Sequence, residues 1–92
     1  MGREYADVDV PMNIRERGHT STYTQGVLSL RDSGNRILRE YIEQRRAQGW
    51  QTEGPTEMMA LFYDHRLNYK THWLTGRMTL KSARLTFYKD TP

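Results

Sequence analysis

The chain has 92 residues, a net charge of +3 and a hydrophobic fraction of 36%. A chain of this length forms one small domain with a thin core, and its ten aromatic residues supply enough buried area for folding. The absence of cysteine excludes disulfides, a thiol nucleophile and a cysteine-based zinc site.

Targeting and membrane signals are weak. The longest apolar run, Met58–Tyr63, is far shorter than the about 20 residues that a membrane-spanning helix needs. The first ten residues include acids where a signal peptide would be apolar. We therefore expect a cytoplasmic protein with no membrane partner and no cofactor.

Charge is distributed unevenly along the chain. Residues 1–64 contain eight Lys and Arg and ten Asp and Glu, whereas residues 65–92 contain six and one. This asymmetry points to an anionic partner for the C-terminal third. The alternative is a solvated basic face that the acids of the other half neutralise.

The first third predicts two strands. Residues 6–15 alternate apolar and polar side chains, which is typical of a half-buried strand, and Pro11 favours an edge position because it cannot donate to a ladder. A second strand is expected over residues 22–30, joined to the first in a hairpin through a turn at Gly18.

An amphipathic helix follows. Asp32 or Ser33 can cap its start, and Gly49 suits the position after its last turn, with Trp50 packing back on that turn. The inner stripe falls at helical spacing and comprises Ile37, Leu38, Tyr41, Ile42 and Arg45.

The second half predicts three more strands. Residues 57–65 are apolar on both parities, which indicates a central strand. Residues 71–90 alternate and predict a hairpin that turns at Lys81–Ser82, with Leu74, Met78, Leu80, Leu85 and Phe87 facing inward. The predicted fold class is α+β, in the order ββαβββ, with a mostly antiparallel sheet and one helix packed on one face.

The outer face of the predicted C-terminal hairpin carries rings between cations. Bases of a single strand stack on aromatic rings while Lys and Arg contact phosphates. We therefore predict a non-enzymatic module that binds nucleic acid, expected to be single-stranded, through this hairpin. The predicted contact residues are Arg66, Lys70, Trp73, Arg77, Lys81, Arg84 and Tyr88. For the two rings, the alternative is that they cap the core edge or pair across strands.

The same face suits a protein partner, because Trp, Tyr and Arg dominate protein interfaces. Asp7 and Asp9 would then be an acidic counterpart on the same molecule, or they blunt an edge strand against aggregation. The short chain without cysteine resembles small phage or mobile-element proteins that block host machinery, anti-CRISPR proteins among them. The alternative function is such an inhibitor or adaptor, docked on a host protein or nucleoprotein complex. A homo-oligomer would bury additional surface.

Catalysis receives little support. His19, His65 and His72 have no spacing that suits a metal site. Asp64, His65 and Arg66 would serve a small ribonuclease as an acid–base group with a phosphate clamp, but neighbouring strand residues point to opposite faces. Tyr63 shares a face with His65 and is the better partner. We predict that the chain is not an enzyme.

Overall fold

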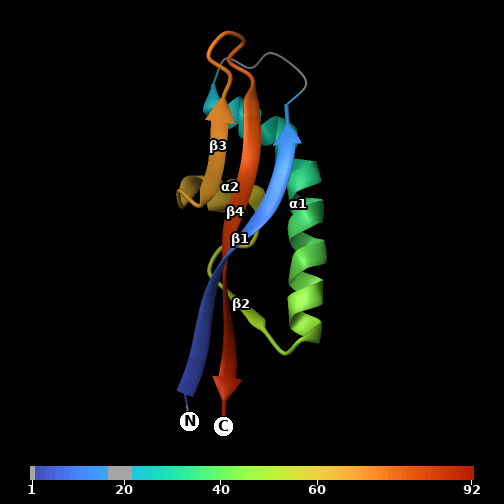
Figure 1. Ribbon diagram of the computed structural model, residues 1–92, viewed down its shortest axis with the longest axis vertical. Helices are drawn as coiled ribbons and strands as arrows, with labels where there is room; N and C mark the ends of the chain where they lie inside the picture. Colours follow the sequence, from blue (N-terminus) through green and yellow to red (C-terminus); the bar gives the residue numbers. More distant parts are fainter. Residues whose placement is uncertain (1, 17–21) are drawn as a thin grey trace.

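A computed structural model describes residues 2–16 and 22–92. The elements in chain order are β1 (Gly2–Arg15), α1 (Tyr23–Ala47), β2 (Gln51–Glu53), α2 (Met58–Tyr63), β3 (Leu67–Thr71) and β4 (Met78–Thr91). The predicted class is confirmed, because an antiparallel sheet has one long helix packed on one face (Figure 1). The molecule is elongated, with principal extents of 53 × 20 × 16 Å.

Strand β4 is the centre of the sheet. Along one edge it pairs with β1 from Gly2 opposite Thr91 to Arg15 opposite Thr79. Along its other edge it pairs first with β3 and then with β2. All three pairings are antiparallel, and β1 lies at an edge of the sheet, as Pro11 predicted.

Residues 23–30 belong to α1, so the predicted second strand over residues 22–30 is wrong. Thr22 caps the helix by accepting a hydrogen bond from the Gln25 N–H at 3.1 Å. The buried stripe of α1 comprises Gly26, Val27, Leu30, Gly34, Leu38 and Ile42, and from Val27 onward its steps are three or four residues. The predicted cap at Asp32 or Ser33 is therefore wrong, because α1 runs through both residues. Gly34 lies so close to Met58 that a Cβ at this position would collide with the methionine side chain.

The predicted end of α1 is confirmed. Gln48 is the C-cap, and Gly49 follows with φ of +91°, a conformation that favours glycine. The Trp50 N–H returns to the Arg45 carbonyl at 3.0 Å, and the Trp50 ring packs against the core.

The predicted central strand over residues 57–65 is also wrong, because Met58–Tyr63 form the short helix α2. Met58 and Leu61 are fully buried and lie one helical turn apart. The Met58 N–H donates to Asn35 Oδ1 at 2.8 Å, which ties the start of α2 to α1. A short apolar run fits a buried strand or a buried helix equally well, and packing against α1 decides for the helix.

The predicted turn at Lys81–Ser82 does not exist. Strand β4 runs through it, with only a shift of register against both neighbours at this point. The chain turns instead at residues 72–77, between β3 and β4. Met78, Leu80, Leu85 and Phe87 are buried as predicted, but Leu74 lies in the turn and is 71% exposed.

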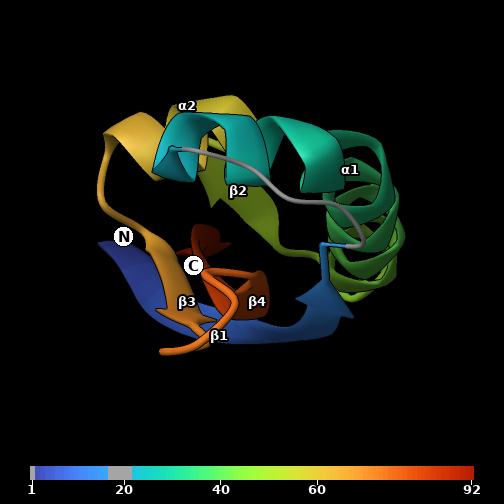
Figure 2. The same cartoon turned by 90° about the horizontal axis from the view of Figure 1, so that it is seen from above.

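The core lies between one face of the sheet and the two helices (Figure 2). On the opposite face no element covers the sheet in the parts of the chain described above, so this outer face meets solvent. Neither α1 nor α2, the helices found in the described ranges, is long and apolar enough to cross a membrane.

Candidate nucleic-acid interface

The seven predicted contact residues are spread along the length of the sheet. Trp73 and Arg77 lie in the turn between β3 and β4, not on a strand face as predicted. Arg66 and Arg84 lie at mid-height, whereas Tyr88 lies near the other end of β4. Tyr88 lies ten positions along β4 from Met78, which corresponds to about 34 Å. Trp73 and Tyr88 therefore do not form one stacking surface.

The turn at residues 72–77, called the tip, holds its shape through local hydrogen bonds. The His72 N–H donates to the Arg77 carbonyl and the Gly76 N–H donates to the His72 carbonyl, both at 2.8 Å. His72 Nδ1 accepts from the Leu74 and Thr75 N–H groups at 3.2 and 3.3 Å. Gly76 has φ of +70°, which a side chain would disfavour.

The tip presents apolar side chains to solvent. Trp73 is 87% exposed, and Leu74 beside it is also exposed. The Trp73 ring stacks on the His72 imidazole, with 6.1 Å between centroids and 19° between planes. The indole therefore lies nearly parallel to the imidazole and remains accessible for stacking.

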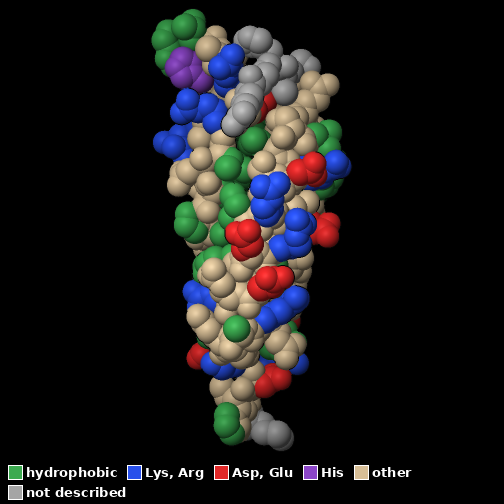
Figure 3. All heavy atoms as spheres, turned by 90° about the vertical axis from the view of Figure 1, so that its right-hand side faces the viewer, with side chains coloured by type: hydrophobic (Ala, Val, Ile, Leu, Met, Phe, Trp, Pro, Cys, Tyr) green, Lys and Arg blue, Asp and Glu red, His purple; other side chains and the backbone are tan. Residues whose placement is uncertain are grey.

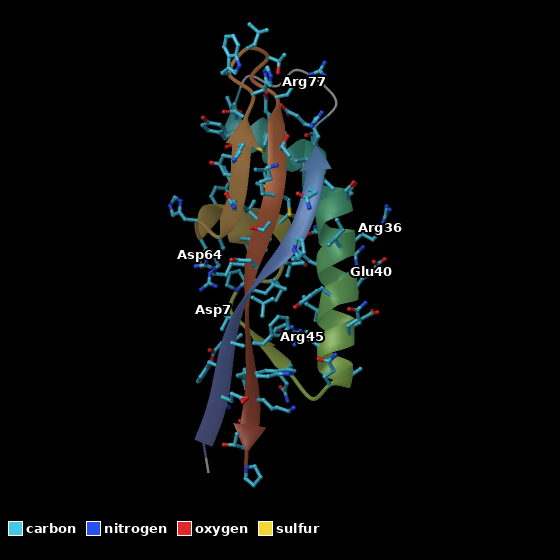
Figure 4. The ribbon with its side chains drawn as sticks, viewed as in Figure 1. Asp7, Arg36, Glu40, Arg45, Asp64 and Arg77 are labelled. Atoms are coloured by element: carbon cyan, nitrogen blue, oxygen red, sulfur yellow. The ribbon has the colours of Figure 1, made fainter. Side chains whose placement is uncertain are left out.

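Cations surround the tip. Lys70 on β3 and Arg15 on β1 both stand opposite Thr79 of β4, so they flank this strand on the outer face. Arg77 lies at the upper end of the molecule (Figure 4) and shares a hollow with Arg15. Lys81 lies at the register shift in β4 and is half-buried. We call Arg15, Lys70, Arg77 and Lys81 the basic end.

The cations of the basic end have no carboxylate partner among the residues that the structure describes. The ion pairs of those described residues involve other cations, Arg3, Arg31, Arg66 and Arg84. Figure 3 shows Lys and Arg beside His and hydrophobic side chains at the top of the molecule, while acids and bases alternate farther down. Sequence reasoning missed Arg15 as a site residue, although the alternation of residues 6–15 places it on the polar side.

The middle of the outer face carries both signs of charge. Arg84 Nε lies 3.0 Å from Asp9 Oδ1, and Arg66 Nε lies 2.6 Å from Asp64 Oδ2. Hydrogen bonding with Asp9, followed by the charges of Asp9 and Asp7, raises the pKa of Arg84 above its ordinary value. At mid-height, acidic residues therefore neutralise the basic ones, as in the alternative to an anionic partner.

A threonine links these groups across the sheet. Thr86 Oγ1 donates to Asp7 Oδ1 at 2.6 Å and accepts from Arg66 at 3.0 Å. Asp7 and Asp64 lie close to each other at mid-height in Figure 4. The groove at this point has a volume of about 460 Å³ and is lined by Asp7, Asp9, Asp64, His65, Arg66, Leu67, Asn68, Ser82 and Arg84. Its three carboxylates outnumber its two guanidinium groups, which disfavours a phosphate.

Tyr88 is engaged within the protein. The Arg3 guanidinium lies 4.3 Å from its ring centroid, and its hydroxyl donates to Gln51 Oε1 at 3.0 Å. Hydrogen bonding with Tyr5, together with the charge and hydrogen bond of Asp90, raises the pKa of Arg3 above its ordinary value. The alternative of cross-strand pairing describes this ring, because Tyr5 is its direct partner on β1.

The histidines lie apart. His65 follows α2 in a turn with φ of +58°, and Tyr63 is the last residue of α2. The two residues therefore do not share a strand face as predicted. His72 lies in the tip, and His19 falls outside the described residues. No group of three or more His, Asp or Glu suited to a metal ion occurs within residues 2–16 and 22–92.

Comparisons with protein-family models, curated proteins and solved structures gave no match.

Proposed function

We propose that this chain binds single-stranded nucleic acid at the tip and the basic end. The observation that carries the proposal is the exposed Trp73 ring beside four cations that lack a carboxylate partner in the described structure. A base stacks on the free face of Trp73, and Arg15, Lys70, Arg77 and Lys81 contact the adjacent phosphates.

The acids at mid-height limit the path of the strand. A phosphate over the central groove would meet three carboxylates and only two guanidinium groups, so the net charge there repels it. The bound segment is therefore short and stays at the upper end of the sheet. Arg66, Arg84 and Tyr88, which were predicted contacts, act mainly within the protein because each already has a partner there.

A duplex fits this site less well than a single strand. Stacking on Trp73 requires a base whose face is free, and in a duplex each face is covered by a neighbouring pair. We expect affinity in the order single strand above duplex at the same salt concentration. The proposed contacts are to base rings and to phosphates, which DNA and RNA share, so we expect both to bind.

The test is fluorescence anisotropy with labelled single-stranded DNA, single-stranded RNA and duplex DNA of about ten nucleotides, a length within the usual site range. Counterion release predicts a slope of log affinity against log salt of about −3 for four phosphate contacts. Arg77→Glu should weaken binding and flatten this slope. Arg36→Glu is the matched control, because Arg36 lies on the side of α1 away from the sheet (Figure 4).

Two outcomes contradict the proposal. Absence of binding at low salt would remove the function itself. Equal weakening by Arg77→Glu and Arg36→Glu would mean that only net charge matters and that the tip is not the site.

A further inference from the structure

Strand β3 has an open edge. It pairs with β4 on one side, and no strand in the described chain lies on the other (Figure 1). The Arg84 N–H donates to the Arg66 carbonyl at 2.9 Å, and the His72 N–H donates to the Arg77 carbonyl at 2.8 Å. Hydrogen-bonded positions alternate in an antiparallel ladder. Leu67, Tyr69 and Thr71 therefore direct their N–H and C=O groups away from β4, toward the open edge.

The same strand borders an aromatic groove. Leu67 and Tyr69 stand opposite the buried residues Ala83 and Leu80, so their side chains point to the helical face of the sheet. The groove has a volume of about 360 Å³ and is lined by Tyr23, Phe62, Tyr63, His65, Leu67 and Tyr69. It contains no Lys, Arg, Asp or Glu.

The rings of this groove come from three elements. Tyr23, in the first turn of α1, lies 5.4 Å from Tyr69 between ring centroids, and Phe62 lies 5.5 Å from Tyr63. Figure 2 shows the first turn of α1 and α2 on the same side of β3. Tyr63 is 69% and Tyr23 54% exposed, although both carry large apolar rings. The groove therefore offers apolar area directly beside unpaired backbone groups.

The open backbone groups of β3 and the aromatic groove can be used by the same added strand. A strand added to β3 would pair with Leu67, Tyr69 and Thr71, and the residues opposite these three would send their side chains into the aromatic groove. The intervening residues would lie on the outer face beside Lys70, which has no carboxylate partner among the described residues. An acidic side chain complements it there.

We propose that β3 and the aromatic groove bind an extended segment of a partner protein by strand addition. The segment carries apolar side chains at alternate positions and at least one acidic residue between them. Main-chain hydrogen bonds supply affinity and the groove selects the alternate side chains, as in other strand-addition complexes. The two proposals share Lys70 and are distinguished by Tyr63, which serves only the groove, and by Arg77, which serves only the tip.

Two other occupants fit less well. The groove itself has no cation to contact a phosphate, which disfavours a nucleic acid. A second copy paired through β3 would bring only Leu67–Thr71, a segment without an acidic residue, opposite Lys70. Only a different polypeptide with its own acids satisfies both faces of the added strand.

The experiment is selection from a displayed library of random peptides of about seven residues, the length of a short strand. We expect enrichment of sequences that alternate apolar and Asp or Glu residues. Synthetic versions of the enriched peptides should bind at least about tenfold more weakly to Tyr63→Ala, as expected for an aromatic anchor. Leu28→Ala is the matched control, because Leu28 is exposed on α1 but does not line the groove.

Two further variants test the pairing itself. N-methylation of the peptide at residues that pair with β3 should abolish binding, whereas methylation of the intervening residues should not. Lys70→Glu should shift the selected peptides from acidic to basic intervening residues, and Arg36→Glu should leave the selection unchanged. Thermal unfolding of each protein variant checks that the fold is retained.

Several results would overturn the inference. No enrichment, enrichment without alternation, or equal effects of Tyr63→Ala and Leu28→Ala would each do so. A concentration-dependent dimer lost in Tyr63→Ala would assign the edge to a second copy. Loss of oligonucleotide binding in Tyr63→Ala would assign the groove to bases, whereas an unchanged Arg77→Glu affinity would count only against the nucleic-acid proposal.

Discussion

Asp9 of β1 and Arg84 of β4 stand directly opposite each other on the outer face, with Arg84 Nε 3.0 Å from Asp9 Oδ1. The pair joins residues that are 75 positions apart in the chain. The charge of Arg84, the most central cation of the predicted binding face, is therefore paired within the protein. Among the predicted contact cations, those without a carboxylate partner in the described residues are therefore Lys70, Arg77 and Lys81, toward one end of the sheet.

Arg84→Gln should change nucleic-acid affinity far less than Arg77→Glu, because Arg84 already has a carboxylate partner. Arg84→Glu should lower the melting temperature more than Arg84→Gln, since like charges directly opposite each other on a sheet destabilise it. Thermal unfolding and anisotropy on the same variants check both statements. A loss of affinity in Arg84→Gln as large as that in Arg77→Glu would return Arg84 to the binding site.

The pH dependence of this pair follows from the sign of the shift. The folded-state pKa of Arg84 is raised, so its contribution to stability is complete below the ordinary arginine pKa and is lost only as pH rises through the folded value. The difference in melting temperature between the natural chain and Arg84→Gln should therefore stay constant from neutral to mildly alkaline pH. A difference that shrinks within that range would contradict this account.

Trp73→Ala should separate binding from folding. The side chain is 87% exposed, so its removal should leave the free energy of unfolding nearly unchanged. The affinity for single-stranded oligonucleotides should fall by about 1–3 kcal/mol, the contribution of one base stacked on a ring. Leu74→Ala is the neighbouring control, because Leu74 is exposed but has no ring. Unchanged affinity in Trp73→Ala would show that the indole does not stack on a base.

Glu16 should matter for stability although it carries a charge. It is 2% exposed, and its Oε1 accepts a hydrogen bond from the Met78 N–H at 2.8 Å at the start of β4. Glu16→Ala should destabilise the fold by about 1–3 kcal/mol, since it leaves this buried donor without its acceptor. Glu16→Gln keeps an acceptor oxygen and should cost less. Urea unfolding compares the two, and equal losses would argue against the hydrogen bond as the cause.

Gly34→Ala tests the contact between the helices. A Cβ at this position would collide with the Met58 side chain, so we expect a loss of about 1–3 kcal/mol from overpacking, despite the better helix propensity of alanine. Ser33→Ala, at the adjacent exposed position, should be neutral or slightly stabilising. Combining Gly34→Ala with Met58→Ala should make the effect of the glycine substitution smaller, as measured by a double-mutant cycle in urea.

Local patterns in the sequence predicted a substantial part of the fold. The alternation of residues 6–15 identified strand β1, and the inward parity of Met78, Leu80, Leu85 and Phe87 is observed. Gly49 marked the end of α1 because its conformation depends on only a few neighbouring residues. Features of this kind depend on residues that are close together in the chain, so they can be predicted from the sequence.

The errors share a physical cause. Residues 22–30 and 58–63 are short segments whose apolar positions fit either a helix or a strand. Whether they form helices depends on contacts between residues that are far apart in the chain. These contacts are the close approach of Gly34 to Met58 and the hydrogen bond from the Met58 N–H to Asn35. The turn at Lys81–Ser82 failed similarly, because pairing with β1 and β3 on both edges keeps β4 extended there.

The sequence by itself determined the α+β class, the basic C-terminal third and the outward direction of Arg84. Composition and side-chain period are properties of the chain that do not depend on which segments meet. Only the tertiary structure decided that Arg84 is paired, because the pairing of β1 with β4 places Asp9 directly opposite it. It also placed Trp73 in a tip and Tyr63 beside an open edge, since both positions depend on where β4 finds its partners.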